Sequence, residues 1–107
     1  MLEKFTNDEL KTLVDNQKVV LFFSASWCPD CIFIDPYIPK LEKEFNDFKW
    51  IHVDRDEHMD VAQENNVMGI PSFICFDHGK EVGRFVDKDR KTYDQVKDFL
   101  NQVESKL

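Results

Sequence analysis

The stretch that decides the fold is KVVLFFS at positions 18–24, followed after two residues by WCPDC at positions 27–31. The first segment is apolar, partly β-branched and short enough for a strand that is buried on both faces. From position 29 to about 46, apolar residues recur every three or four positions, which predicts an amphipathic helix. Pro29 suits its first turn, whereas Pro36 removes a backbone hydrogen bond, so we expect a kink near Pro36. The two cysteines therefore lie where a buried strand passes into a helix.

The rest of the chain alternates between helical and strand patterns. Thr6 and Glu9 form a capping-box pattern before one helix, and Met59 and Ala62 are the expected inner positions of another. Gly79 can take the positive φ that a hairpin turn requires. We predict helices at 7–15, 57–65 and 89–105, strands at 48–53, 71–76 and 81–86, and a turn at 77–80.

This order of elements predicts an α/β fold with one mixed central sheet and helices on both faces. The alternating first half requires a parallel βαβ unit, and the C-terminal hairpin, which a helix follows, adds antiparallel edge strands. A chain of 107 residues is close to the usual size of one domain. We therefore assign 1–107 to a single domain.

Composition and charge exclude several classes of protein. Hydrophobic residues make up 42% of the chain and include ten Phe, which is enough for a core and excludes a disordered chain. The net charge of −7 repels phosphate groups, so neither nucleic acid nor an anionic membrane is an expected partner. No apolar run approaches the roughly 20 residues of a membrane-spanning helix, and the residues after Met1 form no export signal. We therefore expect a cytoplasmic protein.

Cys28 and Cys31 are spaced so that a helix brings them close together. Cys28 falls at the helix start, where free backbone N–H groups and the positive end of the helix dipole stabilise a thiolate. Cys31 lies one turn further on, nearer the core. This arrangement predicts that Cys28 attacks a substrate disulfide and that Cys31 resolves the mixed disulfide.

Asp30, between the two cysteines, is expected to modulate this chemistry. A carboxylate about 5 Å from the Cys28 sulfur opposes the thiolate by roughly 3 kcal/mol at an effective dielectric of about 20, and by less in water. The helix terminus acts in the other direction by about 0.5–2 kcal/mol, so the two effects nearly cancel. We therefore expect a reductant rather than a strong oxidant. In the alternative interpretation, Asp30 is an ordinary first-turn acid that favours the helix.

The cysteines also admit other interpretations. One C-x-x-C pair supplies only half of a zinc site, and His52, His58 and His78 lack ligand spacing, so no metal is expected. The pair is alternatively two unrelated buried thiols. Cys75 lies inside an apolar strand pattern and is interpreted as a core residue, with a regulatory thiol as the alternative.

The sequence resembles the thioredoxin family over essentially its whole length. The resemblance rests on VLFF at 20–23 leading to WCPDC, on Pro36, on VD at 53–54, on GIPS at 69–72, and on Gly79 and Gly83. A C-x-x-C pair beside a βαβ pattern is the typical signal of this fold. The resemblance implies the thioredoxin fold, dithiol chemistry and a cis peptide bond before Pro71.

The resemblance also implies a substrate-binding groove beside the cysteines. Its residues are Trp27, Ile70, Pro71 and Gly83, with Pro29 as a further substrate-binding residue. An extended substrate would pair with the backbone of Ile70, as in strand addition. Ordinary packing is the alternative role of Trp27 and Ile70.

The chain departs from the family pattern at several positions. Pro-Asp stands between the cysteines where the family usually has Gly-Pro. The family's buried acid matches Phe22, and the lysine partner of that acid matches Trp50. Without the acid, either water or Asp30 takes the proton of Cys31, or Cys31 is not activated efficiently. Asp35, one turn after Cys31, is a weaker candidate.

The sequence therefore predicts a thioredoxin-like thiol–disulfide oxidoreductase that reduces protein or small-molecule disulfides in electron transport and redox homeostasis. No tightly bound cofactor is expected. Electrons would come from a thioredoxin-reductase-like flavoenzyme or a low-molecular-weight thiol, and the protein is expected to be a monomer. The alternatives are a thioredoxin-fold docking module with incidental cysteines, and a disulfide oxidase or isomerase.

Overall fold

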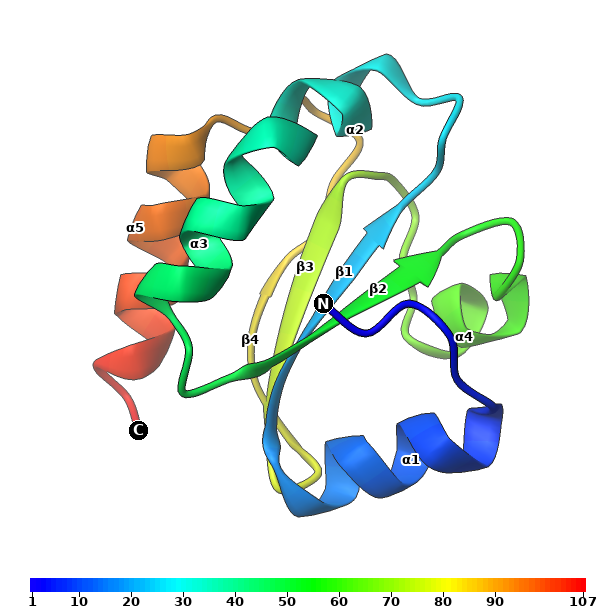
Figure 1. Cartoon of the computed structure of the whole chain (residues 1–107), viewed down its shortest axis with the longest axis vertical. Helices are drawn as coiled ribbons and strands as arrows, with labels where there is room; N and C mark the ends of the chain where they lie inside the picture. The colour runs from blue at the N-terminus through cyan, green and yellow to red at the C-terminus, as the bar shows by residue number, and fades with distance from the viewer.

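Four strands form one sheet, and helices cover both of its faces (Figure 1). The computed structural model describes all residues from 1 to 107. Its strands are β1 (Lys18–Ser24), β2 (Lys49–Asp54), β3 (Ser72–Asp77) and β4 (Lys80–Phe85). Its helices are α1 (Asn7–Asn16), α2 (Pro29–Ile34), the 3₁₀ helix η1 (Asp35–Tyr37), α3 (Ile38–Glu44), α4 (Met59–Glu64) and α5 (Tyr93–Glu104). None of them combines the length and the apolar character that crossing a bilayer requires.

The strand order is β2-β1-β3-β4, so β1 and β3 occupy the middle of the sheet. β1 pairs with β2 in parallel and with β3 antiparallel, and β3 pairs with β4 antiparallel. The predicted parallel unit and mixed sheet are confirmed. The prediction that both hairpin strands lie at an edge is wrong, because only β4 does. β3 is buried from Ser72 to Cys75, as expected for a strand with neighbours on both sides.

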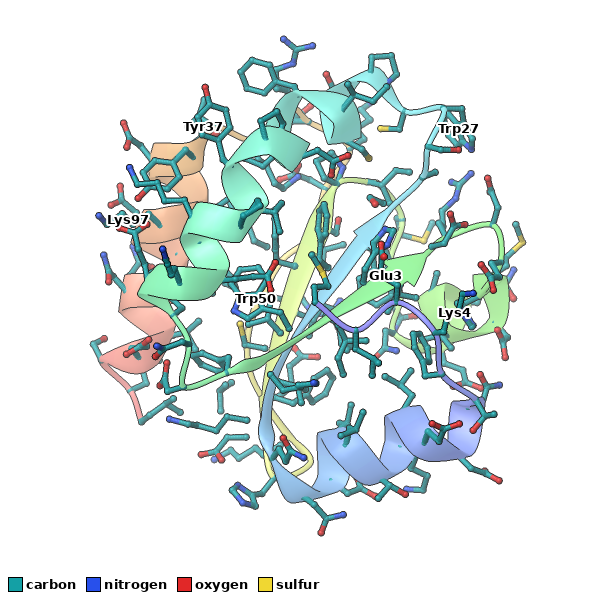
Figure 2. All side chains as sticks on the ribbon, in the orientation of Figure 1. Glu3, Lys4, Trp27, Tyr37, Trp50 and Lys97 are labelled. Atoms are coloured by element: carbon teal, nitrogen blue, oxygen red, sulfur yellow. The ribbon has the colours of Figure 1, made fainter.

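β1 is buried on both faces, as its composition predicts. Every residue from Val19 to Ser24 is buried. Phe23 packs in the cluster beneath α1 and α4, whereas Phe22 packs in the cluster beneath α3 and α5. The helix pairs accordingly lie on opposite sides of the sheet (Figure 1). Trp50 of β2 lies on the side that faces α3 (Figure 2).

The segment after the cysteines is helical but bent, as Pro36 predicts. α2 gives way to η1 at Asp35, and α3 begins at Ile38. Pro36 lies in η1, and Pro39 lies in the first turn of α3, where a missing N–H leaves no hydrogen bond unmade. The bend therefore redirects the helix without ending it. The helix ends at Glu44, slightly before the predicted end.

Two helix predictions are wrong in detail. Of the two expected inner positions of α4, Ala62 is buried as predicted, but Met59 is 46% exposed because α4 begins there and buries Val61 in its place. α5 begins at Tyr93 rather than at 89, because the capping box that starts it belongs to Thr92. The residues before Thr92 form a loop instead, and Arg90 of this loop contacts Asp30, which stands between the two cysteines in the sequence.

Two local predictions are confirmed. Thr6 Oγ1 accepts the backbone N–H of Glu9, and the Glu9 carboxylate accepts the backbone N–H of Thr6. At the hairpin, His78 and Gly79 have φ angles of 49° and 87°. Two successive positive φ angles are typical of a tight β-hairpin. These signals fix the start of α1 and the β3–β4 turn.

Candidate active site

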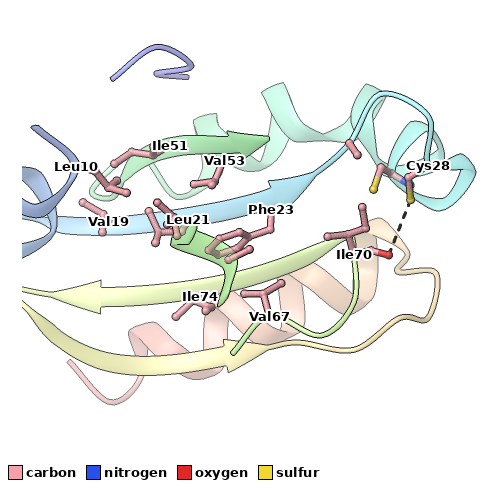
Figure 3. Packing of buried hydrophobic residues seen from close by; sticks show 14 residues of the cluster. Leu10, Val19, Leu21, Phe23, Cys28, Ile51, Val53, Val67, Ile70 and Ile74 are labelled. Atoms are coloured by element: carbon pink, nitrogen blue, oxygen red, sulfur yellow. Dashed lines mark hydrogen bonds between the residues drawn. The ribbon is translucent and has the colours of Figure 1, made fainter. Parts of the chain in front are cut away.

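Cys28 lies at the mouth of α2, where it is the N-cap residue. Its Sγ accepts a hydrogen bond from the backbone N–H of Cys31 at 3.3 Å, and its thiol donates to the carbonyl oxygen of Ile70 at 3.9 Å (Figure 3). The two cysteines are 5% and 1% exposed. The structure therefore places both cysteines at the strand-to-helix junction, and a backbone N–H points at the first sulfur.

Cys31 is the more deeply buried of the two thiols. Burial raises the pKa of the Cys31 thiol to about 12, and its contact with Cys28 adds to this effect. A hydrogen bond with the backbone of Ala25 acts in the opposite direction. Cys31 therefore keeps its proton near neutral pH, whereas the sulfur of Cys28 receives an N–H. This difference between the two thiols favours the predicted order, in which Cys28 attacks first and Cys31 attacks second.

The loop before β3 forms the opposite wall of the site. The Ile70–Pro71 peptide bond is cis, as the resemblance implies. Ile70 turns its carbonyl oxygen toward Cys28, while its side chain is buried in the core. Ser72 Oγ contacts the carbonyl oxygen of Gly69 at 2.6 Å and that of Asp87 at 3.4 Å. Ser72 thus links the loop before β3 to the segment that follows β4.

Trp27 presents an exposed ring beside the cysteines, in the loop between β1 and α2 (Figure 2). Its indole N–H donates to Asp56 Oδ2 at 2.6 Å, and the guanidinium of Arg55 lies 5.1 Å from the ring centroid. These contacts hold the ring in one orientation. Pro29 is exposed on the same segment. Sequence reasoning missed Asp56 and Arg55, because no local pattern links a loop after β2 to Trp27.

Gly83 does not belong to this surface, so the prediction that it lines the groove is wrong. It pairs with Cys75 within the sheet. A Cβ on Gly83 would meet Val103 at 2.5 Å and Phe99 at 3.3 Å, both from α5. A glycine here lets α5 approach β4 closely. The family resemblance identified Gly83 as a significant glycine, but it did not indicate that this glycine faces α5.

Asp30 is paired with an arginine that no local pattern indicates. Its Oδ1 accepts a hydrogen bond from Nε of Arg90 at 2.8 Å. The guanidinium of Arg90 also lies 4.3 Å from the centroid of the Phe33 ring. The expected repulsion between the Asp30 carboxylate and a Cys28 thiolate is therefore reduced, because a positive charge is bonded to the carboxylate.

Phe22 fills the position of the family's buried acid and is fully packed. Its ring stacks on Phe73 with 4.9 Å between centroids. Trp50, in the place of the lysine partner, donates its indole N–H to a backbone carbonyl oxygen at 3.2 Å. A cavity of about 440 Å³ lies beside Phe22 and is also lined by Ala25 and Asp35. The aromatic residues thus replace both the acid and its lysine partner, and His52, whose ring centroid lies 5.6 Å from that of Phe22, is the titratable side chain that faces this position.

The two candidate proton acceptors for Cys31 lie in different surroundings. Asp35 lines the cavity, and its negative charge adds to the raised pKa of Cys31. Asp30 is instead bonded to Arg90. Ser24 and His52 also line the cavity, with Ser24 Oγ 2.6 Å from His52 Nε2. Asp35 is therefore the acid that faces an open polar space near Cys31.

Cys75 is a core residue outside this site, whereas His52, one of the metal-ligand candidates, lines the cavity beside Phe22. Cys75 is fully buried in β3, and burial raises the pKa of its thiol to about 12. Its interpretation as a core residue is confirmed. No group of three or more His, Cys, Asp or Glu side chains is arranged to hold a metal ion.

Gly69 is expected to tolerate no side chain, because the segment after β4 lies directly against it. A Cβ there would lie 2.5 Å from the backbone nitrogen of Lys88 and 2.7 Å from the carbonyl carbon of Asp87. Gly69→Ala is expected to lower the free energy of unfolding by about 1–3 kcal/mol in urea denaturation. Met68→Ala, at a residue that is 89% exposed, is the control and should change it by less than about 0.5 kcal/mol. An alanine variant as stable as the parent contradicts the close approach.

A family model described as Thioredoxin matches residues 1–102. The chain belongs to the thioredoxin family. Thioredoxin H2 of Arabidopsis thaliana is 39% identical over 92 residues, which cover 86% of this chain and 64% of that protein. Mitochondrial thioredoxin-2 of Schizosaccharomyces pombe is 33% identical, with 85% of this chain and 68% of that protein covered. The solved structure of Fasciola hepatica thioredoxin matches with a TM-score of 0.81 and 27% identity, covering 95% of this chain and 98% of that one.

These comparisons confirm the resemblance and the thioredoxin fold. Thioredoxin-family membership and the Cys28–Cys31 pair together support a thiol–disulfide oxidoreductase. Neither the comparisons nor the geometry favours a docking module with incidental cysteines.

Proposed function

We propose that this protein reduces disulfides in proteins or small molecules by dithiol exchange, with Cys28 attacking and Cys31 resolving. The observation that carries the proposal is the N-cap geometry of Cys28, whose Sγ receives the backbone N–H of Cys31 at 3.3 Å. An N–H donor stabilises the thiolate, which is the nucleophile of disulfide exchange. Cys31, buried one helical turn later, is placed to attack Cys28 afterwards.

The reaction begins when the Cys28 thiolate attacks one sulfur of the substrate disulfide. A Cys28–substrate S–S bond forms, the substrate's own S–S bond breaks, and the departing sulfur takes up a proton. Cys31 then loses its proton and attacks Sγ of Cys28, which forms the Cys28–Cys31 disulfide and releases the second substrate sulfur as a thiol. The substrate thus gains two electrons and two protons. The protein loses two electrons and the proton of Cys31, and water supplies the second proton because Cys28 reacts as a thiolate.

We assign substrate binding to the surface that surrounds the Cys28 sulfur. The carbonyl oxygen of Ile70 faces this sulfur, so an extended substrate segment that pairs with the loop of Ile70 and Pro71 would bring its disulfide to Cys28. Trp27 and Pro29, both exposed, supply the apolar contact on the other side. Binding through backbone pairing accommodates many substrate sequences.

The proposal includes a source of electrons and a place in the cell. The Cys28–Cys31 disulfide is reduced again by a thioredoxin-reductase-like flavoenzyme or by a low-molecular-weight thiol, without a tightly bound cofactor. The relatives include a plant thioredoxin H2 and a mitochondrial thioredoxin. We place this protein in the cytoplasm, as a one-domain monomer that serves electron transport and redox homeostasis. Imaging of the tagged chain in cells tests the location.

Replacing Cys31 by serine is expected to trap the first intermediate. Without the second thiol, the mixed disulfide of Cys28 persists, so protein substrates remain attached and elute only with a reductant. The double variant Cys28→Ser/Cys31→Ser is the control and should retain none of them. The unchanged protein should also reduce insulin disulfides with a dithiol as electron donor. An empty trap together with no insulin reduction would refute the proposal.

A further inference from the structure

Arg90, from the loop between β4 and α5, contacts α2 at two points. Its Nε donates to Oδ1 of Asp30 at 2.8 Å, and its guanidinium lies 4.3 Å from the centroid of the Phe33 ring. Asp30 and Phe33 are three residues apart in α2 and therefore lie on one face of the helix. A single arginine thus binds the acid that stands between the two cysteines and packs on the aromatic ring beside it.

A buried lysine fixes the loop that carries Arg90. Lys91 is only 1% exposed, and its Nζ donates to Asp87 Oδ1 at 2.8 Å, to the carbonyl oxygen of Asp87 at 3.3 Å and to that of Asp89 at 2.9 Å. All three ammonium protons therefore have acceptors. The contact with Lys91 lowers the pKa of the Asp87 carboxyl, which favours the carboxylate that accepts this hydrogen bond. Arg90, the preceding residue, is thereby held against α2.

We propose that Arg90 is a positioning residue of the dithiol site, which binds the Asp30 carboxylate and offsets its negative charge at Cys28. The inference rests on the proposed function, in which Cys28 reacts as a thiolate. The Arg90–Asp30 pair carries no net charge. Without Arg90, a lone carboxylate stands in the helical turn that Cys28 caps, and like charges disfavour the thiolate.

The solvent exposure of Arg90 and Asp30 determines how strongly their charges affect the reactivity of Cys28. The side chains of Arg90 and Asp30 are 51% and 35% exposed, so water and salt screen their charges. We therefore expect changes of about twofold in the reactivity of Cys28 when one charge is removed. The direction must differ between the two residues, because their charges have opposite signs.

The test is the rate at which iodoacetamide alkylates Cys28 in the reduced protein at neutral pH and low salt, with mass spectrometry to locate the label. Arg90→Ala is expected to slow the reaction about twofold, and Asp30→Asn to speed it about twofold. The double variant is expected to return to the parent rate, because both charges are then absent. Arg90→Lys, which keeps the positive charge, should stay near the parent rate. Salt at about 1 M, where the Debye length is about 3 Å, should reduce every difference.

The pattern across the variants decides between electrostatics and simple anchoring. A double variant as slow as Arg90→Ala would mean that Arg90 only holds the loop, and it would overturn the proposal, as would equal rates in all variants. The measurement needs no disulfide substrate, so it is separable from the proposed function. An empty Cys31→Ser trap leaves the charge pattern standing, whereas a label on Cys31 in place of Cys28 refutes the assignment of the attacking thiol.

Discussion

The release of product from the Cys28 mixed disulfide is expected to become about a hundredfold faster between pH 7 and pH 9, because Cys31 attacks only as a thiolate. Burial raises the pKa of the Cys31 thiol to about 12. Below its pKa a thiol is mostly protonated, so the thiolate fraction grows about tenfold for each pH unit. Phe22 stands where the family has a buried acid, so no acid inside the sheet takes this proton at neutral pH.

A chromogenic mixed disulfide makes this step visible. Thionitrobenzoate is coupled to Cys28, and stopped-flow absorbance follows its release as the Cys28–Cys31 disulfide closes. This leaving group needs no proton, so the pH profile reports on Cys31 alone. Cys31→Ser is the control and should release nothing. A rate that is constant between pH 7 and pH 9 would contradict the prediction and would mean that a nearby group, such as Asp35 at the cavity, accepts the proton.

The cysteine geometry is predictable from the sequence because it is local. Cys28 and Cys31 lie within one helical turn, and the apolar run before them is identified by composition alone. The capping box at Thr6 and the bend at Pro36 are local in the same sense, since neighbouring residues decide the conformation. These features have their physical cause within a few residues and agree with the structure, whereas the capping box at Thr92 is equally local but the prediction overlooks it and starts α5 too early.

The side-chain pairs around the cysteines are not predictable in this way, because they join distant segments. Asp56 lies 29 residues from Trp27, and Arg90 lies 60 residues from Asp30. The segment DKDRK at 87–91 contains three bases and two acids, and only the path of the folded loop decides which base meets which acid. Lys91 shows this most clearly, because its burial requires three oxygen acceptors that exist together only in the folded loop.

Introducing the family's acid, by Phe22→Asp, is expected to lower the free energy of unfolding by about 4–6 kcal/mol at neutral pH. Removing a buried phenylalanine side chain alone costs about 3–5 kcal/mol. Phe22 is 1% exposed and stacks on Phe73, so the new carboxylate would be buried as well. Trp50 occupies the place of the cation that pairs with the acid in the family, so a buried carboxylate without that cation adds to the loss. His52, which faces Phe22 across the β1–β2 pair, is the side chain that would reduce this addition. The total free energy of unfolding of a typical domain is only about 5–15 kcal/mol, so partial unfolding of this variant is expected.

Urea denaturation of Phe22→Asp and Phe22→Ala at several pH values separates the charge from the lost packing. Burial raises the pKa of an unpaired carboxyl group, so the introduced acid is more often protonated in the folded state than in the unfolded state. Its extra destabilisation, relative to the alanine variant, is therefore present near pH 7 and shrinks as the pH falls toward about 5. If both variants lose the same stability at every pH, the cavity beside Phe22 hydrates the carboxylate. In that case packing does not explain why an aromatic residue, rather than an acid, occupies this position of β1.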